Sequence, residues 1–373
     1  MNNLVVFGGH SAVPGATPIP HVRIDGAVVG CGVVPAAEPA FRAASPDDGG
    51  RVLVEVRAFS CNYRDKTFCR AISALDAGRF STVGSEFMGV VREVGHAVST
   101  LRPGDRVITN QHYEGVTRGA DGVRHGVVSN QASRRWHVLP EQKLRRIPDR
   151  MSDEVGGGFG LNAQTAYSMI RRAGLAPGAR VLVTSATSNT SLALIGGLLA
   201  RGLEVYAATT SPGWVPRLRE TGVRDVLAAP RAEGGFRCGD AADRFARAVG
   251  GFDCVMDPFF DLHLEKALQL MNPFGTYVTC GLFGQNPDAA RDSGTDAPMD
   301  VRPVLQSAIA RNLSIVGNCI GLAGDLDQAI ADFESGALRP LVDRSYGGDD
   351  AAGFLERTYN DPQRFGKVVF HYA

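Results

Sequence analysis

Between residues 180 and 280 the chain alternates short apolar segments with segments that have helical periodicity. The apolar segments are VLVTS, EVYAAT, DVLAA, FDCVMDP and TYVTCG, and the helical segments between them are SLALIGGLLARG, WVPRLRETG, AADRFARAVG and HLEKALQLM. Such alternation is typical of a parallel sheet whose strands are joined by helices. The pattern therefore predicts an α/β domain with a doubly wound parallel sheet, which we place at residues 159–301.

The part of the chain before this domain has a different pattern. Within residues 22–110 the segments RVLVEVRAF, GVVREVG and RVIT are rich in valine and are separated by Gly and Pro, which indicates strands and turns. The C-terminal segment GKVVFHY also predicts a strand. Because 373 residues exceed one ordinary core, we expect a β-rich domain made of residues 1–158 and 302–373, with the α/β domain inserted into it.

Composition excludes some functions. The formal net charge is zero, so there is no electrostatic footprint for nucleic acid or an acidic membrane surface. No apolar run approaches the ~20 residues of a membrane helix, and the N-terminus lacks the charged start and long apolar stretch of a signal peptide. The seven cysteines form no C-x-x-C pair, which is typical of free thiols in a reducing cytosol. We therefore expect a cytoplasmic protein.

Several segments in this architecture resemble the medium-chain dehydrogenase/reductase superfamily in their order and spacing, over nearly the whole chain. They are VLVEVRAFSCNYRD (52–65), GSEFMGVVREVG (84–95), RPGDRV (102–107), LNAQTAYSMI (161–170), the strand–turn–helix unit at 181–211, SGALRPLVDRSY (335–346) and FGKVVF (365–370). The NYRD motif is most similar to the zinc-free quinone and enoyl reductase branch. The resemblance implies a GroES-like β-rich catalytic domain and a Rossmann domain with a doubly wound parallel sheet.

The same resemblance bears on metal binding. Zinc-dependent members hold a catalytic zinc through a Cys, a His and a second Cys, and the matching positions here are Asn62, Ser85 and Leu161. These residues do not supply the tetrahedral set of nitrogen, sulfur or carboxylate donors that zinc requires. The structural zinc of those relatives uses four closely spaced cysteines, and residues 110–137 contain none. We therefore expect no metal site.

The strand–turn–helix unit lacks the glycines of a dinucleotide-binding turn. The family pattern has glycines at Ala186, Ser188 and Ser191, for a tight turn, close approach to pyrophosphate and helix–strand contact. Asn189 tolerates a left-handed backbone, and a helix N-terminus attracts phosphate. Hydroxyl donors are available from Thr187, Ser188, Thr190 and Ser191. The unit therefore still predicts cofactor binding; the alternative is that Ser and Asn only cap the helix.

The end of the second strand of this unit favours NADP(H) over NAD(H). NAD-selective relatives place an acid there to hold the ribose 2′-hydroxyl, whereas this chain has Thr209, Thr210 and Ser211, followed by Arg217 and Arg219. An arginine can pair with a 2′-phosphate. The alternative is that both arginines only face water.

The resemblance also implies residues near the nicotinamide. Thr165 and Tyr167 resemble a TAY segment that lies on the nicotinamide side in relatives. Cys280, Gly281 and Asn318 fall where loops of relatives approach the nicotinamide ring. We expect these residues to line the cofactor site.

The NYRD motif is the candidate for catalysis. Hydride delivered to the β-carbon of a conjugated carbonyl leaves an enolate, which needs a hydrogen-bond donor and then a proton. Tyr63 can donate, with Asn62 or Gln164 polarising the carbonyl, while Arg64 and Asp65 are expected to pair structurally. The alternative for Tyr63 is that its ring packs under the cofactor.

Residues 110–137 are polar and Gly-rich and have no helical period, so we expect a loop that shapes the pocket of a small-molecule substrate. His112, His125 and His137 lie in or beside this loop. Because neither metal ligands nor a nucleophile accompany them, we expect all three at the surface.

Three functions remain open. The leading one is a zinc-free, NADPH-dependent reductase of a conjugated carbonyl or quinone. The second is a non-redox biosynthetic enzyme, such as a cyclase, lyase or addition catalyst, with a degenerate cofactor site, and the third is a catalytically silent binding protein. The apolar, β-branched segments TYVTCGLFG and LSIVGNCIG predict an edge through which two copies pair as a homodimer.

Overall fold

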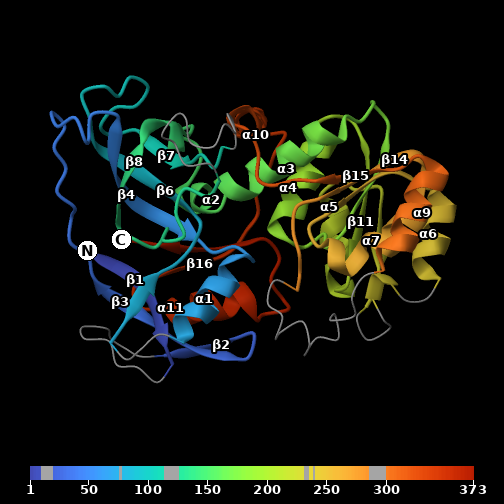
Figure 1. Cartoon of the computed structure of the whole chain (residues 1–373), viewed down its shortest axis with the longest axis horizontal. Helices are drawn as coiled ribbons and strands as arrows, with labels where there is room; N and C mark the ends of the chain where they lie inside the picture. Colours follow the sequence, from blue (N-terminus) through green and yellow to red (C-terminus); the bar gives the residue numbers. More distant parts are fainter. Residues whose placement is uncertain (10–19, 75–77, 113–125, 231–234, 238–239, 285–299) are drawn as a thin grey trace. The chain divides into compact units, whose positions relative to one another are not determined.

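The computed structural model describes residues 1–9, 20–74, 78–112, 126–230, 235–237, 240–284 and 300–373. The described residues form two compact units, one made of Met1–Leu161 with Leu341–Ala373 and the other of Asn162–Pro340. We call them the discontinuous unit and the inserted unit, and Figure 1 labels many of their helices and strands. Within these ranges no helix has both the length and the apolar character needed to span a bilayer.

The discontinuous unit contains two sheets. The strand order of the smaller sheet is β2 (His21–Ile24), β3 (Ala27–Pro35), β1 (Asn2–Gly8) and β5 (Phe80–Thr82). The order of the larger sheet is β16 (Val342–Gly347), β17 (Lys367–His371), β4 (Arg51–Ser60), β6 (Glu86–Val94), β7 (Arg106–Thr109) and β9 (Leu144–Arg146), with β8 (Trp136–Pro140) also paired to β4. The helices are α1 (Asp65–Ser73), α2 (Asp153–Gly157), α11 (Ala351–Tyr359) and the short η1 (Glu141–Lys143).

Strand β4 lies inside the larger sheet, between β17 and β6, and almost all of its residues are buried. It pairs antiparallel with β6 and with the C-terminal strand β17, where Phe59 lies opposite Phe370. The rings of these two residues lie 5.6 Å apart, and Phe354 of α11 packs against both. The C-terminal strand therefore closes the core of the N-terminal part of the chain, so the β-rich unit is discontinuous, as the sequence predicts.

The inserted unit is built from alternating strands and helices. Its elements are α3 (Gly160–Ala173), β10 (Arg180–Val183), α4 (Asn189–Leu199), β11 (Glu204–Thr209), η2 (Pro212–Trp214), α5 (Val215–Glu220), β12 (Asp225–Ala228), η4 (Gly235–Arg237), α6 (Ala241–Val249), β13 (Phe252–Asp257), α7 (Phe260–Gln269), β14 (Met271–Thr279), α9 (Val301–Arg311), β15 (Ser314–Gly317) and α10 (Ala323–Ser335). All neighbouring strands pair in parallel. The prediction of a parallel α/β sheet is therefore confirmed.

The order of the parallel sheet is β12-β11-β10-β13-β14-β15. In chain order this is 3-2-1-4-5-6, the order of dinucleotide-binding folds. The chain reverses its direction of progress between β10 and β13, and ligands of such sheets bind outside the carboxyl ends of the strands at this switch point. The ends of β10 and β13 are therefore where a cofactor site is expected.

One boundary differs from the sequence prediction. Residues 302–340 belong to the inserted unit, because β15 extends its parallel sheet by pairing with β14. Helix α10 is tied to α3 of the same unit: Arg171 donates to both carboxylate oxygens of Asp325 at 2.7 and 3.0 Å, and Tyr167 donates to Asp332 at 2.7 Å. The chain returns to the discontinuous unit only at Leu341.

Candidate functional site

The turn between β10 and α4 is tight although it contains no glycine. Its one left-handed residue is Ser185, with φ +47°; the prediction placed the glycine-type positions at Ala186, Ser188 and Ser191 instead. The N–H of Ala186 donates to the carbonyl of Ala208 on β11 at 3.0 Å, and the N–H of Ser188 donates to the carbonyl of Ser185 at 2.8 Å. A serine in the left-handed region is strained by about 1–2 kcal/mol, so surrounding contacts must hold it there.

Three of the four predicted hydroxyl donors are used inside the unit. Ser188 caps α4 by accepting from the N–H of Ser191 at 3.3 Å, and its hydroxyl donates to the Ser191 hydroxyl at 2.9 Å. The Ser191 hydroxyl donates to the carbonyl of Thr184 at 2.8 Å, and the Thr190 hydroxyl donates to Asn162 at 3.2 Å. Ser188 therefore caps α4, as the alternative interpretation of the sequence expects. Other hydrogen-bond donors of the turn are not used by this capping.

The remaining donors suit an anion. Within the described ranges, neither the Thr187 hydroxyl nor the backbone N–H groups of Asn189 and Thr190 have a hydrogen-bond partner, and these N–H groups lie in the first turn of α4. The side-chain oxygen of Asn189 is buried and also unpartnered there. A side-chain amide can present oxygen or nitrogen at such a point, so it suits a phosphate oxygen or a ribose hydroxyl. The residues of this turn therefore fit a dinucleotide.

Sequence reasoning missed a buried polar cluster at the switch point. Asp257, the last residue of β13, is fully buried and accepts from the Thr184 hydroxyl at 2.6 Å, from His263 Nδ1 at 2.8 Å, from the N–H of Phe259 at 2.9 Å and from the Tyr277 hydroxyl. Burial by itself raises the pKa of Asp257, but the hydrogen bonds from His263, Thr184 and Tyr277 outweigh it, and the net pKa is lowered. Asp257 is therefore ionised at neutral pH. The available signal was an acid directly after the apolar residues Cys254–Met256 at the carboxyl end of the strand.

The two arginines beyond β11 have different environments. The guanidinium of Arg219 donates to Asp225 at 2.9 Å, and both side chains are about half exposed. The guanidinium carbon of Arg217 lies 5.8 Å from the centre of the Trp214 ring. Thr209 is buried, and its hydroxyl oxygen accepts from the N–H of Ser211 at 3.1 Å, while Thr210 is half-buried.

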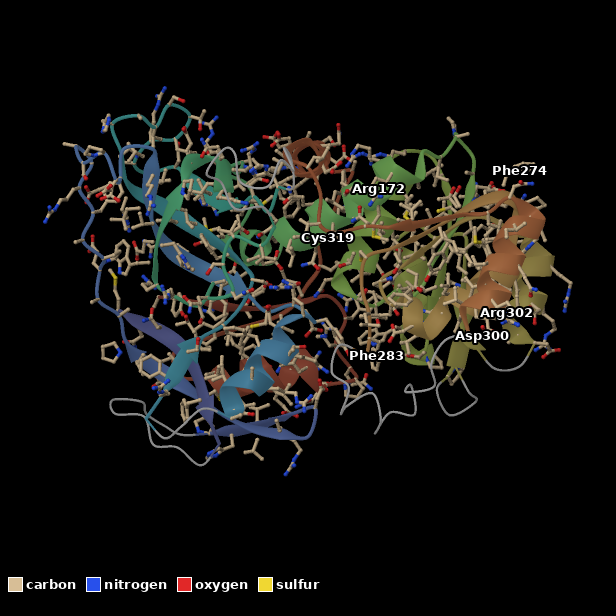
Figure 2. The ribbon with its side chains drawn as sticks, in the orientation of Figure 1. Arg172, Phe274, Phe283, Asp300, Arg302 and Cys319 are labelled. Atoms are coloured by element: carbon tan, nitrogen blue, oxygen red, sulfur yellow. The ribbon has the colours of Figure 1, made fainter. Side chains whose placement is uncertain are left out.

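The residues expected near the nicotinamide support a loop after β15. Asn318 is buried; its side-chain oxygen accepts from Ser168 at 2.9 Å and from Arg172 (labelled in Figure 2) at 3.3 Å. Its side-chain nitrogen donates to the carbonyl of Ile320 at 2.9 Å, and Ile320 has φ +52°, which is rare for a β-branched residue. Gln164 is fully buried and donates to the carbonyl of Leu322 at 2.9 Å. Asn318 and Gln164 are therefore brought together as supports of this loop.

The other predicted residues of this group lie on α3 and after β14. Thr165 is buried on α3, and the guanidinium of Arg201 lies 4.8 Å from the centre of the Tyr167 ring. Cys280 and Gly281 follow β14. A β-carbon on Gly281 would lie 2.5 Å from the carbonyl oxygen of Pro258, so this position requires glycine. The thiol of Cys280 has its pKa raised to about 12 by burial, so it is a neutral thiol.

In the discontinuous unit, the positions that match zinc ligands of relatives meet around the carboxylate of Glu86. The Asn62 side-chain nitrogen donates to the Ser85 hydroxyl at 3.0 Å and to Glu86 Oε1 at 2.9 Å, and the N–H of Leu161 donates to Glu86 Oε2 at 2.8 Å. The ammonium of Lys367 donates to the Asn62 side-chain oxygen and to Glu86, both at 2.7 Å. Among the described residues no three acidic, Cys or His side chains form a group that could hold a metal ion.

Lys367 reaches this cluster past the glycine run at residues 156–158. A β-carbon on Gly158 would lie 2.4 Å from Cγ of Lys367, and one on Gly157 would lie 2.8 Å from Cβ of Ala58. The run therefore lets α2 pack closely on the sheet and leaves room for the lysine stem. Lys367, like Asp257, was not predicted from the sequence.

Tyr63 lies beside this cluster and is half-buried, with the ammonium of Lys66 4.9 Å from the centre of its ring. Asp65 is buried; it accepts from the N–H of Asn62 at 2.8 Å and from the Ser85 hydroxyl at 2.7 Å, and it pairs with Arg64 at 3.4 Å. Burial raises the pKa of Asp65, and these partners partly offset the rise.

The prediction that the histidines near residues 110–137 lie at the surface is wrong for two of them. His112 and His137 are 8% and 7% exposed. His137 stacks on Phe87 with ring centres 4.7 Å apart, and burial lowers its pKa to about 4, so it is neutral. His137 lies in β8, whose pairing with β4 turns its side chain into the core. Residues 113–125 of the predicted loop, including His125, lie outside the described residues.

The comparisons with known proteins agree with this geometry. Residues 48–149 match the family model of the alcohol dehydrogenase GroES-like domain. The whole chain superposes on an NAD-dependent alcohol dehydrogenase with a TM-score of 0.75 and 22% identity, and on the CurK enoyl reductase with 0.70 and 18%, covering all of each structure. The chain therefore has the fold of medium-chain dehydrogenases/reductases, with a GroES-like sheet domain and a Rossmann-type parallel-sheet domain.

A curated relative is much longer than this chain. Erythronolide synthase EryA2 of Saccharopolyspora erythraea is 29% identical over 296 residues, which are 79% of this chain and 8% of the synthase. The chain thus spans less than a tenth of the length of that relative.

Proposed function

We propose that this protein is a zinc-independent, NADPH-dependent reductase of a conjugated carbonyl, of the enoyl or quinone type, on a small molecule. The observation that carries the proposal is the turn after β10: it lacks the glycines of the family pattern, yet its N–H groups at Asn189 and Thr190 have no hydrogen-bond partner among the described residues. The likeness to erythronolide synthase EryA2 and to the CurK enoyl reductase supports the substrate class.

In this proposal the inserted unit holds the cofactor, which supplies the hydride when bound. The N-terminus of α4 and the Thr187 hydroxyl hold the pyrophosphate, because unpaired N–H groups and the helix dipole both favour an anion there. Asn318 and Gln164 act as positioning residues, since their amides already support the loop around Ile320. Thr165, Cys280 and Gly281 remain proposed lining residues of the nicotinamide side.

We propose NADPH rather than NADH as the cofactor because of the charged residues near the end of β11. No acid lies between Glu204 and Glu220, so this stretch of the sequence carries no negative side chain that would repel a 2′-phosphate at the end of β11. We assign the 2′-phosphate contact to Arg217, which follows β11 on α5 next to Trp214 and can form charge-assisted bonds with a phosphate. Thr209, Thr210 and Ser211 are proposed to line the adjoining ribose.

Tyr63 is proposed as the hydrogen-bond donor to the enolate oxygen, or as the proton source at the α-carbon. Asn62 then acts as a positioning residue rather than as a carbonyl donor. Its side-chain nitrogen already donates to Ser85 and Glu86, and its side-chain oxygen accepts from Lys367. This network fixes the start of the NYRD turn and with it the backbone that carries Tyr63.

Calorimetric titration of the purified protein with NADPH and NADH tests the proposal, followed by an assay of NADPH consumption with enoyl thioesters and quinones. Elemental analysis is run on the same sample. We expect NADPH binding and no stoichiometric zinc. Cys61 is the buried thiol next to Asn62, so one zinc per chain that is lost in Cys61→Ser would overturn the zinc-independent assignment. Absence of binding by either nucleotide at millimolar concentration would end the redox proposal.

A non-redox biosynthetic enzyme is the second candidate. The hydroxyls of Ser188, Thr190 and Ser191 are all engaged inside the inserted unit, which is what a turn that no longer binds phosphate would also show. The nucleotide titration separates the two functions directly.

We further propose a homodimer formed through β15, the edge strand of the parallel sheet. Ile315 on this strand is 40% exposed, and the segment SIVG carries no charge and no Pro to protect the edge. Phe274, labelled in Figure 2, is 77% exposed in the neighbouring β14.

The free thiols of six described cysteines suit the reducing cytoplasm, where we propose that the protein is located.

A further inference from the structure

The glycine-free turn is held from both of its ends. The backbone N–H of Thr184 donates to the carbonyl of Met256 on β13 at 3.1 Å, and the carbonyl of Thr184 accepts from the Ser191 hydroxyl at 2.8 Å. The Thr184 side chain donates to the buried carboxylate of Asp257 at 2.6 Å. Thr184 therefore joins three parts: strand β13, the first turn of α4 and the buried acid.

This junction immediately precedes the strained residue. Ser185 is left-handed at φ +47°, a conformation that glycine adopts freely and that serine keeps only when its neighbours hold it. In a turn with glycine, the left-handed backbone costs little, so the turn keeps its shape without further restraint. Here the restraint comes from hydrogen bonds on the preceding residue, Thr184, and on the following one, Ala186, whose N–H donates to Ala208 at 3.0 Å.

We propose that Asp257 is a positioning residue of the dinucleotide site: acting through the Thr184 hydroxyl across the switch point, it holds the glycine-free turn in the shape that presents the N–H groups of Asn189 and Thr190 to phosphate. This inference rests on the proposed cofactor binding. It makes the affinity for nucleotide depend on a carboxylate that touches no part of the nucleotide.

The same carboxylate offers a matched control. Tyr277 of β14 is fully buried and donates its hydroxyl to the other oxygen of Asp257, but it has no bond to the turn. Thr184→Val and Tyr277→Phe each remove one hydroxyl donor from Asp257. A purely structural role of the cluster predicts equal effects on nucleotide binding for the two variants. A positioning role predicts an effect only for Thr184→Val.

The experiment compares wild type, Thr184→Val, Thr184→Ser and Tyr277→Phe by NADPH calorimetry, by urea unfolding and by amide hydrogen exchange of the peptide that covers residues 184–191. We expect Thr184→Val to weaken NADPH binding about tenfold, the usual worth of one hydrogen bond to a charged group, and to speed exchange in that peptide. Thr184→Ser keeps the hydroxyl and should stay within about twofold of wild type. Tyr277→Phe should lower stability without changing exchange in the turn.

Two results would overturn the inference while the proposed function stands: wild-type affinity in Thr184→Val, or equal losses of affinity in Thr184→Val and Tyr277→Phe. If the wild-type protein binds no nucleotide, the proposed function fails instead, and the inference fails with it. The exchange data from the ligand-free protein show independently whether the Thr184 hydroxyl shapes the turn.

Discussion

The ammonium nitrogen of Lys367 lies 2.7 Å from Oε1 of Glu86, and the two side chains are only 5% and 0% exposed. A lysine that enters with the C-terminal strand thus balances the charge of an acid at the start of β6. Asn62 is bonded to both partners, so the pair also fixes the turn that carries Tyr63.

Removing one partner of this pair should destabilise the protein strongly. Lys367→Met removes the cation that balances the buried charge of Glu86, so we expect the free energy of unfolding to fall by about 3–5 kcal/mol. The double variant Lys367→Met with Glu86→Gln should lose less, because both charges of this pair are then removed. Urea unfolding measures both, and a double variant less stable than Lys367→Met would contradict the assignment.

Ser185→Gly should stabilise the protein. Relief of the left-handed strain of about 1–2 kcal/mol exceeds the entropic cost of a glycine, about 0.5–1 kcal/mol, so a net gain of about 0.5–1 kcal/mol is expected. Ser185→Ala keeps the β-carbon and serves as the control without a gain. Thermal unfolding of the three proteins checks this; equal midpoints for the Gly and Ala variants would show that the turn is not strained.

Arg217→Ala should weaken NADPH binding about tenfold, because one charge-assisted contact to the 2′-phosphate is lost, and should leave NADH binding unchanged. Arg219→Ala is the matched control, since its guanidinium is paired with Asp225. The chain has two tryptophans, so quenching of Trp214 by 2′,5′-ADP, read in a Trp136→Phe background, reports on this contact without any turnover. Equal losses in the two arginine variants would refute the assignment to Arg217.

Tyr63→Phe tests the proposed catalytic donor. Loss of one donor to a developing oxyanion typically costs ~10²–10³ in rate, so turnover should fall by that factor while NADPH affinity stays nearly unchanged. Steady-state kinetics and calorimetry on the same preparation measure both quantities. Wild-type turnover would remove Tyr63 from the mechanism, and loss of NADPH binding would instead support packing under the cofactor.

Ile315→Lys should convert the proposed dimer into a monomer, because a lysine on an edge strand opposes pairing with a second edge. Phe80→Lys is the control: Phe80 is also exposed, at 45%, but lies in the discontinuous unit. Sedimentation velocity gives the mass of each variant. A wild-type monomer, or a dimer that persists in Ile315→Lys, would exclude pairing through β15.

The sequence by itself determined the fold, because periodicity is a local property that burial imposes on every strand and helix. The apolar segments VLVTS and FDCVMDP became β10 and β13 of a parallel sheet, and GKVVFHY became the strand that closes the β-rich unit. The absence of thiolate and imidazole at Asn62, Ser85 and Leu161 was equally visible, since it depends only on residue type.

Tertiary structure alone decided which polar groups meet. Asp257 and Thr184 are 73 positions apart and join across the switch point, and Lys367 and Glu86 are 281 positions apart; no local pattern encodes such pairs. The lack of a local pattern for such long-range pairs also explains the two sequence predictions that were wrong. His137 is buried because β8 pairs with β4, and residues 302–340 stay in the inserted unit because β15 adds to its sheet. In our proposal, hydrogen bonds to a buried carboxylate restrain a turn that lacks glycine, and only the folded structure shows where these bonds form.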